Sequence, residues 1–294
     1  HPDDPNRPLM TATELVDFYE QQGPGIFGTR EYENSGALWD AGPLEDFLKE
    51  KFGETRIQDT RVPVMVSAYD SEKGEAVWLK NLGADVNQPG QPNPLLWHAA
   101  RATSAAPTKF LPIEVGMGDG PPETTRRLVD GGVFANMPAM PAYAMTKKIL
   151  EQRDSPQKIE MLSIGTSGKD FTMSADKIAS TTGFGWAIDL FKKISPIREI
   201  NELGKETSAN YLLNSLLGDR YHRWDIPLAH DFGKKFSPTG ALDDASPRNI
   251  EKLKFVGEQF IAKNWERIST LADRLMPDRT PGAPPVLAHR AELR

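Results

Sequence analysis

The chain has 294 residues and a mass of 32.6 kDa, enough material for one large α/β domain or two smaller ones. Its 35 Lys and Arg residues against 41 Asp and Glu residues leave a formal charge of -6 without any basic run, so nucleic acid is not an expected partner. No stretch approaches the roughly 20 consecutive apolar residues of a membrane-spanning helix. The polar segment that begins at His1 lacks the pattern of a signal peptide. We therefore expect peripheral contact with lipid at most, and a cytoplasmic location is favoured.

Cysteine is absent, which excludes disulfides, thiolate nucleophiles and thiolate metal ligands. The 5 histidines show no HExxH spacing and no arrangement with nearby carboxylates that is typical of a zinc site. We expect an activity that needs neither a metal nor another cofactor.

The N-terminal part of the chain predicts two helices. Thr11 and Glu14 form a capping-box pattern ahead of an amphipathic helix that we expect to break near Gly23 and Pro24. A second helix runs through PLEDFLKEKFG and is expected to end at Gly53. Each helix has its own start or stop signal in the sequence.

Strands and helices then alternate. RVPVMVSAYD and EAVWLKN read as partner strands, and LLWHAARATSAAPTKF as a helix up to about Ala106, where Pro107 ends it. Further elements are expected in this order: strands FLPIEV and RRLVDGG, a helix from about Met137 with Pro138 near its first turn, a buried strand KIEMLSIGTSG, helices at 186–194 and 200–217, a strand YHRWDIP, and one long helix over 247–275 with Ser246 as N-cap and Pro247 at its first position.

This alternation predicts a layered α/β sandwich with helices on both faces of a sheet. No repeat or low-complexity linker divides the body, so we expect a single domain over residues 1–275. The proline-rich segment 276–294 has no apolar period and is expected to be an extended appendage.

The segment LVDGGVFANMP contains the main candidate for chemistry, Asp130. Two glycines after an aspartate tolerate positive φ and favour a plain turn at the end of a strand. The carboxyl ends of parallel strands are also where α/β proteins bind their ligands. From these residues alone, both a turn and a catalytic role for Asp130 remain open.

Several segments together resemble the patatin-like phospholipase family of serine acyl hydrolases: TATELVDFYEQQGPGIF, LWHAARATSAAPTKF, LVDGGVFANMP, MLSIGTSG, LGDRY and ALDDASP. The resemblance extends to about Leu275. It implies a three-layer α/β/α sandwich with a mostly parallel central sheet, like that of cytosolic phospholipase A2, and a helical C-terminal third.

The resemblance also implies a Ser-Asp dyad in place of a catalytic triad. The aspartate motif of the family falls on Asp130, Gly131, Gly132, Asn136 and Pro138. Asp130 would then be the base that takes the proton of the attacking serine, and burial would raise its basicity. The glycines and Asn136 would shape the site. The methionine that follows Asn136 departs from the asparagine often found there, which affects the loop and not the base.

The GxSxG nucleophile motif and the GGGxRG oxyanion loop of the family do not occur in the 294 residues. In the family both precede the helix that resembles TATELVDFYEQQGPGIF. One interpretation is that the serine lies in an N-terminal segment outside this chain. A second is a natural pseudoenzyme that keeps the fold as a lipid-binding or protein-binding module. A third makes Ser167, in a glycine-bracketed loop, a substitute nucleophile.

Other candidates have weaker support. Arg101 and Ser104 could orient the site, although an alanine-rich helix is more often packed closely against a sheet. His98 has no carboxylate at helical spacing. The segment GFGWAIDLFKKI, which includes Trp186, could touch a lipid surface or cover an acyl pocket, and core packing is the alternative.

The sequence therefore predicts a lipid acyl hydrolase, similar to phospholipase A or lysophospholipase, that acts on a phospholipid or another acyl ester without a metal. Its base would be Asp130 and its serine would lie outside this chain.

Overall fold

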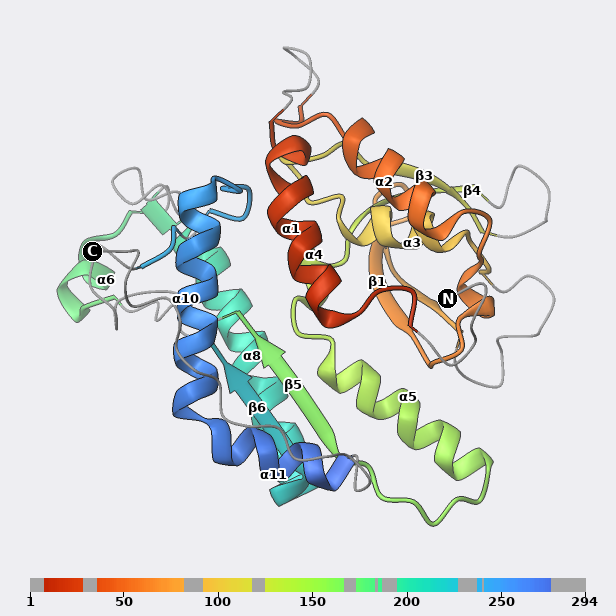
Figure 1. Ribbon diagram of the computed structural model, residues 1–294. Helices are drawn as coiled ribbons and strands as arrows, with labels where there is room; N and C mark the ends of the chain where they lie inside the picture. Colours follow the sequence, from red (N-terminus) through yellow and green to blue (C-terminus); the bar gives the residue numbers. More distant parts are fainter. Residues whose placement is uncertain are drawn as a thin grey trace. The chain divides into compact units, whose positions relative to one another are not determined.

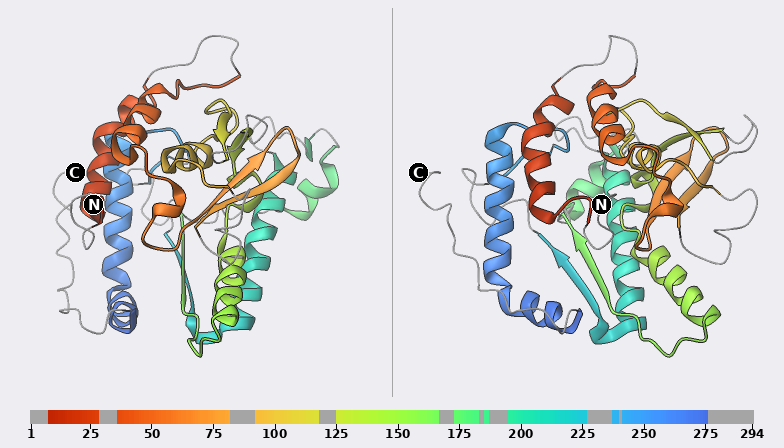
Figure 2. Two further views of the ribbon diagram at one scale, coloured as in Figure 1. Left: turned by 90° about the vertical axis from the view of Figure 1, so that its right-hand side faces the viewer. Right: turned by 45° about the vertical axis from the view of Figure 1, so that its right-hand side comes forward.

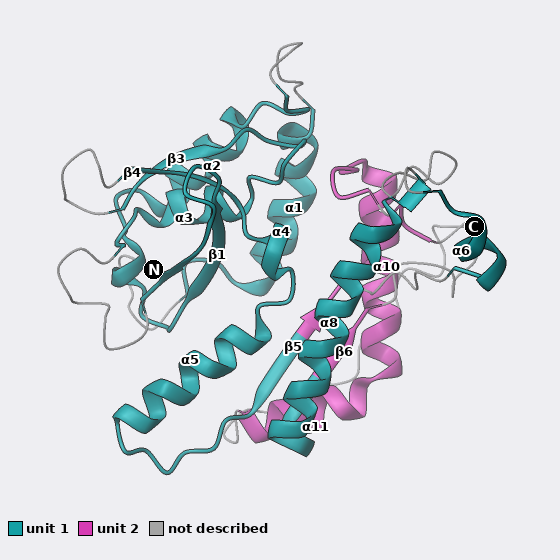
Figure 3. Cartoon of the chain, turned by 180° about the vertical axis from the view of Figure 1, so that it is seen from behind, with its two compact units in different colours: residues 1–163, 171–222 teal, residues 164–170, 223–294 magenta. Residues whose placement is uncertain are grey.

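The computed structural model describes residues 8–28, 36–81, 92–117, 125–166, 173–182, 185–186, 195–226, 237–239 and 241–275. The chain divides into two compact units, shown in Figure 3: the first comprises His1–Ser163 and Phe171–His222, the second Ile164–Asp170 and Arg223–Arg294. The expected single domain over 1–275 stays a prediction. The appendage 276–294 lies outside the described residues.

Helices and strands of the described chain, labelled in Figure 1, follow this order: α1 (Ala12–Ile26), α2 (Gly42–Phe52), the 3-10 helix η1 (Ile57–Asp59), β1 (Met65–Asp70), β2 (Glu75–Lys80), α3 (Leu96–Thr103), β3 (Ile113–Gly116), β4 (Thr125–Asp130), α4 (Gly132–Ala135), α5 (Ala139–Gln152), β5 (Met161–Gly165), α6 (Ala175–Ser180), α8 (Pro196–Leu217), the 3-10 helix η3 (Gly218–Arg220), β6 (Tyr221–Asp225), α10 (Pro247–Lys263) and α11 (Trp265–Leu275).

The capping box at the start of α1 is confirmed. The Thr11 amide donates to the Glu14 carboxylate at 2.7 Å, and the Glu14 amide donates to the Thr11 hydroxyl at 3.2 Å. The expected break near Gly23 and Pro24 is wrong, because α1 continues to Ile26 with Pro24 inside it. Pro24 lies in the last turn of α1. Its missing N–H therefore removes one hydrogen bond near the end of the helix and leaves the earlier turns intact.

Four strands form the main sheet in the order β2-β1-β4-β3. All three strand pairs are antiparallel. The hairpin between β1 and β2 explains part of this arrangement: Asp70 is buried and accepts hydrogen bonds from the amides of Glu72 (3.0 Å) and Lys73 (2.9 Å), and Gly74 follows at φ 70°. A turn this short can only join antiparallel strands. The expectation of a mostly parallel sheet therefore does not hold for the sheet of β1 to β4, which is antiparallel.

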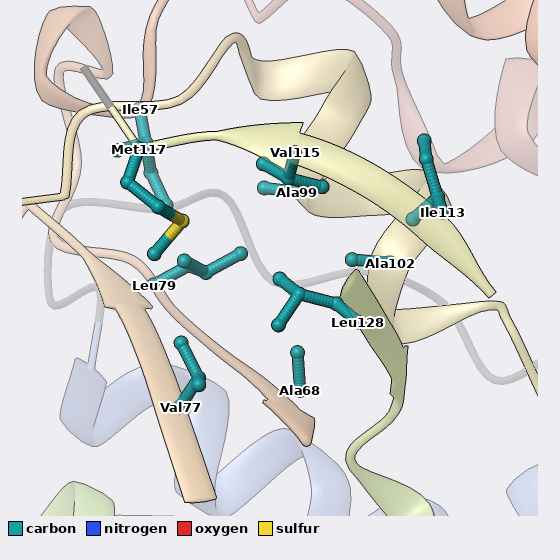
Figure 4. Close-up of a cluster of buried hydrophobic side chains, with 10 residues drawn as sticks. All are labelled: Ile57, Ala68, Val77, Leu79, Ala99, Ala102, Ile113, Val115, Met117 and Leu128. Carbon is teal, nitrogen blue, oxygen red and sulfur yellow. The ribbon is translucent and has the colours of Figure 1, made fainter. Parts of the chain in front are cut away.

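One face of this sheet contains a core cluster of the first unit, shown in Figure 4. Side chains of a strand alternate between the faces, so Ala68, Val77 and Leu128 point to the same side by their register. Ala99 and Ala102 of α3 pack against that side and are fully buried. Small alanine side chains let the helix approach the sheet closely, as the sequence indicated.

The helix α3 ends three residues before the expected Ala106, at Thr103. The helix expected from Met137 is α5, with Pro138 as its N-cap, and the four-residue α4 precedes it. Residues from α5, α8 and β6 form another apolar cluster in the same unit, which includes Ala139, Leu213 and Tyr221.

The strands β5 and β6 form a separate two-stranded sheet. His222 lies 2.8 Å from the carboxylate of Glu160, and the Ile226 amide donates to the Gly165 carbonyl at 3.2 Å. The residue numbers of the partners rise together, from Glu160 with His222 to Gly165 with Ile226. The pair is therefore parallel, as the arrowheads in Figure 1 show. The expectation of a buried strand here is wrong for one face, because Leu162 and Ile164 are exposed.

The long helix expected over 247–275 is two helices, α10 and α11, that meet at a sharp bend in both views of Figure 2. The Ser246 hydroxyl accepts a hydrogen bond from the Asn249 amide, which confirms the expected N-cap. At the bend, the Asn264 side-chain amide donates to the Phe260 carbonyl at 2.8 Å and so caps α10. None of the described helices is long and apolar enough to cross a membrane.

Candidate functional site

Asp130 is the last residue of β4 and lies opposite Ala68 of β1. Its backbone amide donates to the Ala105 carbonyl at 3.0 Å, in the loop that follows α3. The register places its side chain on the face of the sheet that α3 covers, as for Leu128 two residues earlier. The backbone of Asp130 is therefore held by β1 on one side and by the loop after α3 on the other.

The two glycines after Asp130 do not provide positive φ, contrary to the sequence-based expectation. Gly131 has a φ of -66°, and neither glycine is among the described glycines with positive φ. A Cβ on Gly131 would instead collide with the backbone carbonyl carbon and the side chain of Ser67. Glycine is needed because the end of β4 approaches β1 closely, which is a packing requirement that spacing along the chain does not reveal.

Gly132 orients the carboxylate directly. Its amide donates to Asp130 Oδ1 at 2.7 Å, and a Cβ on Gly132 would lie 3.3 Å from the same oxygen. Among the described residues, no donor is bonded to Oδ2. One carboxylate oxygen is thus fixed by the backbone, while the other can accept a proton from a partner.

Burial raises the pKa of the Asp130 carboxyl above its ordinary value, and the hydrogen bond from the Gly132 amide partly opposes this shift. Desolvation disfavours the charged form of a carboxylate and so makes it a stronger base. A carboxyl at a strand end with a raised pKa, and no cation bound to it within the described residues, has the properties of a general base.

The opposite face of the sheet supports the loop after Asp130. Phe134 of α4 packs edge-on against Trp78, with ring centroids 5.5 Å apart, and lies 6.0 Å from the Tyr69 ring. Trp78 is the register partner of Ser67. Asn136, the third residue expected to shape the site, is exposed at the end of α4.

The described partners of the Arg101 side chain belong to α2 and to the segment after α3, and Asp130 is not among them. It is 2% exposed, its Nε lies 3.2 Å from a carboxylate oxygen of Glu45, and its Nη2 donates to the Leu111 carbonyl at 3.0 Å. Burial lowers its pKa, and the Glu45 carboxylate opposes that shift. Arg101 therefore links α3 to α2.

Two other sequence candidates have local partners. The Ser104 hydroxyl donates to the Ala100 carbonyl at 2.8 Å. His98 lies against the Trp97 ring with centroids 3.8 Å apart, and burial lowers its pKa. In the described part of the chain, no hydrogen bond joins either side chain to Asp130.

Ser167 and most of GFGWAIDLFKKI lie outside the described residues. Within that segment the structure describes 185–186, where the Trp186 amide donates to the Thr182 carbonyl at 3.0 Å.

The sequence interpretation missed two features, one beside Asp130 and one in the loop that follows α3. One is Ser67, whose small side chain faces Gly131; the only signal was its place in the alternating strand before Asp70. The other is Thr108, which has a φ of 72° and whose carbonyl accepts from the Leu38 amide at 3.0 Å. Positive φ is costly for a β-branched residue, and no feature of the sequence predicted this conformation at Thr108.

The fold and site define an α/β protein with a desolvated carboxylate at a strand end. In sequence comparison, the profile described as "Patatin-like phospholipase" matches residues 5–143, which include Asp130, Gly131, Gly132 and Asn136.

Similar proteins agree with that match. The chain is 29% identical over 286 residues to patatin-like protein 4 of Arabidopsis thaliana, covering 91% of this chain and 70% of that protein. It is 27% identical over 299 residues to patatin-like protein 2 of Oryza sativa subsp. indica (91% and 71% covered) and 26% identical over 278 residues to patatin-12 of Solanum tuberosum (89% and 68%). Over 89–91% of its length the chain is therefore similar to patatin-like proteins, and its residues 5–143 match the patatin-like phospholipase profile.

Proposed function

We propose that this chain is the aspartate-bearing part of a lipid acyl hydrolase that cleaves carboxylic esters through a Ser-Asp dyad. The family match supports hydrolysis of lipid acyl esters in general terms. The observation that carries the finer proposal is Asp130: its pKa is raised by burial, and it lies within the matched region. Its nucleophilic partner is a serine outside this chain.

In the proposed reaction, the serine hydroxyl attacks the ester carbonyl while Oδ2 of Asp130 accepts its proton. The tetrahedral intermediate collapses, the lipid alcohol leaves with that proton, and an acyl-serine remains. Water then attacks the acyl-serine, gives a proton to Asp130, and releases the fatty acid as the serine regains its proton. Atoms and charges balance with water as the only co-reactant, and the reaction needs no metal.

The backbone around Asp130 has a defined role in this scheme. The Gly132 amide keeps Oδ1 in place, so the carboxylate does not rotate when Oδ2 takes the proton. The close approach of Gly131 to Ser67 fixes the position of the strand end. A positioned base contributes about 10²–10⁴-fold to such a reaction.

The complete protein would have the three-layer α/β/α sandwich of a single patatin-like domain. In that arrangement the serine-bearing segment adds parallel strands to those described here. Phospholipid or lysophospholipid would be the substrate, met at a lipid surface.

The test uses the complete protein, with its serine segment, and the variant Asp130→Asn. We expect kcat/KM on a soluble short-chain ester to fall about 10²–10⁴-fold, because asparagine cannot accept the proton. Asp46→Asn, at an exposed position of α2, removes one negative charge away from the site and should leave the rate unchanged. Near-normal turnover by Asp130→Asn would refute the dyad.

Labelling with a fluorophosphonate locates the serine. Intact mass spectrometry should show the adduct on the segment outside the 294 residues. An adduct within this chain would assign the nucleophile to Ser167. Absence of any adduct on the complete protein would support the alternative function, a catalytically silent module that binds lipid or protein.

A further inference from the structure

The loop between α3 and β3, residues 104–112, contacts the strand end that carries Asp130. The Ala105 carbonyl of this loop accepts a hydrogen bond from the Asp130 amide at 3.0 Å. The bond joins two segments that lie 25 positions apart in the sequence. The position of the loop therefore helps to fix where the end of β4, and with it the Asp130 side chain, lies.

The same loop contains a residue in an unfavourable backbone conformation. Thr108 has a φ of 72°, which is costly for a β-branched residue. Such a conformation persists only where surrounding contacts hold it. The Leu38 amide donates to the Thr108 carbonyl at 3.0 Å, and the Trp39 amide donates to the Lys109 carbonyl at the same distance. These two bonds hold the middle of the loop, and its ends are held by a side chain.

That side chain is Arg101, in the last turn of α3 just before the loop. Its Nη2 donates to the carbonyl of Leu111, near the far end of the loop, at 3.0 Å. Its Nε lies 3.2 Å from a carboxylate oxygen of Glu45 on α2. The guanidinium also lies over the Phe110 ring, with Cζ 5.4 Å from the ring centroid. One planar group therefore joins the two ends of the loop and anchors them to α2.

Stability alone does not account for a charged side chain at this place. Arg101 is 2% exposed, and its Nη1 is buried without a hydrogen-bond partner among the described residues. Burial of an incompletely paired charge is costly, and apolar side chains of similar volume often stabilise a protein more. A guanidinium offers what an apolar side chain lacks, a rigid fork that bonds in two directions at once.

We propose that Arg101 is a positioning residue for Asp130: by closing the loop 104–112, it holds the Ala105 carbonyl against the Asp130 amide. Arg101 acts through the loop and does not touch the reacting atoms. The proposal rests on the proposed function in one respect, because Asp130 needs a precise position for catalysis only if it is the base of the hydrolase. The position of its carboxylate is nevertheless a property of this chain.

The first test follows the Asp130 carboxyl carbon by NMR in the 294-residue chain, with Asp130→Asn to assign its signal. In the wild type, burial raises the pKa of this carboxyl and the Gly132 amide opposes the shift; no charged side chain is among the causes. Arg101→Lys keeps a positive charge for Glu45 but loses the planar fork. It should loosen the loop, admit water to the carboxyl and move the titration midpoint toward about 3.9, its ordinary value.

Arg220→Lys is the matched control. A guanidinium nitrogen of Arg220 also donates to a backbone carbonyl, that of Ile159, at 3.0 Å, but Arg220 lies on η3, outside the loop. This variant loses the same kind of hydrogen bond and should leave the Asp130 midpoint unchanged. Equal shifts in the two variants, or a folded Arg101→Lys with the wild-type midpoint, would overturn the proposal.

Should Arg101→Lys fail to fold, Glu45→Ala replaces it. This variant removes the partner of the Arg101 Nε, and because the Glu45 side chain is 27% exposed, its truncation removes less burial than a change at Arg101. The Asp130 midpoint should move in the same direction. An unchanged midpoint in the folded Glu45→Ala variant would contradict the positioning role.

Catalysis by the complete protein on a soluble short-chain ester provides the second test. Arg101→Lys should lower kcat about 10–100-fold with little change in KM, because a displaced base slows proton transfer and not substrate binding. Its kcat/KM should also begin to rise at a lower pH than in the wild type, because the base loses its proton at a lower pH. A purely structural role for Arg101 would lower the unfolding temperature and leave the pH dependence unchanged.

Failure of this proposal is separable from failure of the proposed function. If the wild-type complete protein does not hydrolyse the soluble ester, the proposed function fails. The titration of Asp130 in the 294-residue chain still decides whether Arg101 positions its carboxyl, because that measurement requires no activity.

Discussion

Apolar strands are buried to different extents in the four-stranded sheet and in the β5–β6 pair. Leu128 and Val115 in the sheet are fully buried under α3. Ile164 of β5 is 62% exposed, although MLSIG is as apolar as the strands of the main sheet. A strand is buried on both faces only when other elements cover both. Apolar content indicates a strand, but the neighbours determine its burial.

The glycines of the two sheets differ in the same way. Gly131 meets the backbone of Ser67, which cannot move without moving β1. Gly165 meets the ends of the Arg223 and Asp225 side chains, which can rotate. An added Cβ thus meets backbone atoms at Gly131, beside Asp130, but side-chain ends at Gly165, at the end of β5.

The largest difference is expected for core truncation. Leu128→Ala should lower the free energy of unfolding by about 2–5 kcal/mol, because it leaves a cavity beneath α3. Ile164→Ala should cost less than about 0.5 kcal/mol, since its side chain is already exposed. Urea unfolding of both variants measures this. Similar losses in the two would show that β5 is as well covered as the main sheet.

An intermediate difference is expected for the glycines. Gly131→Ala should destabilise the chain by about 1–3 kcal/mol, as overpacking does. Gly165→Ala should cost clearly less, because the Arg223 and Asp225 side chains can move aside. The same urea measurement compares them, and a larger loss for Gly165→Ala would contradict the contrast between backbone and side-chain constraint.

The smallest effect concerns the charge of Asp130. Its raised pKa means that the folded chain holds the proton more tightly than the unfolded chain. The resulting stability is complete below the unfolded pKa, about 3.9, and is lost as pH rises through the folded pKa. Asp130→Asn, which stays neutral, should therefore unfold at a higher temperature than the wild type at pH 7, and the two should converge in acid.

Circular dichroism during heating at a series of pH values checks this. Asp46→Asn controls for the loss of one charge at an exposed position. A wild type more stable than Asp130→Asn at neutral pH would contradict the burial of the carboxylate.

Local signals in the sequence predicted most element types. Thr11 with Glu14 and Ser246 with Pro247 marked helix starts that the structure confirms, because a cap bonds only to residues three positions away. Helix ends were predicted less well. No residue pattern near Thr103 predicted the end of α3 there, and none near Asn264 predicted that the last helix divides.

For the candidate site, the sequence by itself determined that an aspartate follows an apolar strand and precedes two glycines. Only the tertiary structure decided what those residues do: β1 lies against Gly131, Ala105 accepts from the Asp130 amide, and burial raises the pKa of the carboxyl. Each of these depends on segments at least 25 positions away in the sequence. Capping and alternation act between neighbours in the chain and can be read from it, whereas desolvation and close backbone approach exist only after distant strands have paired.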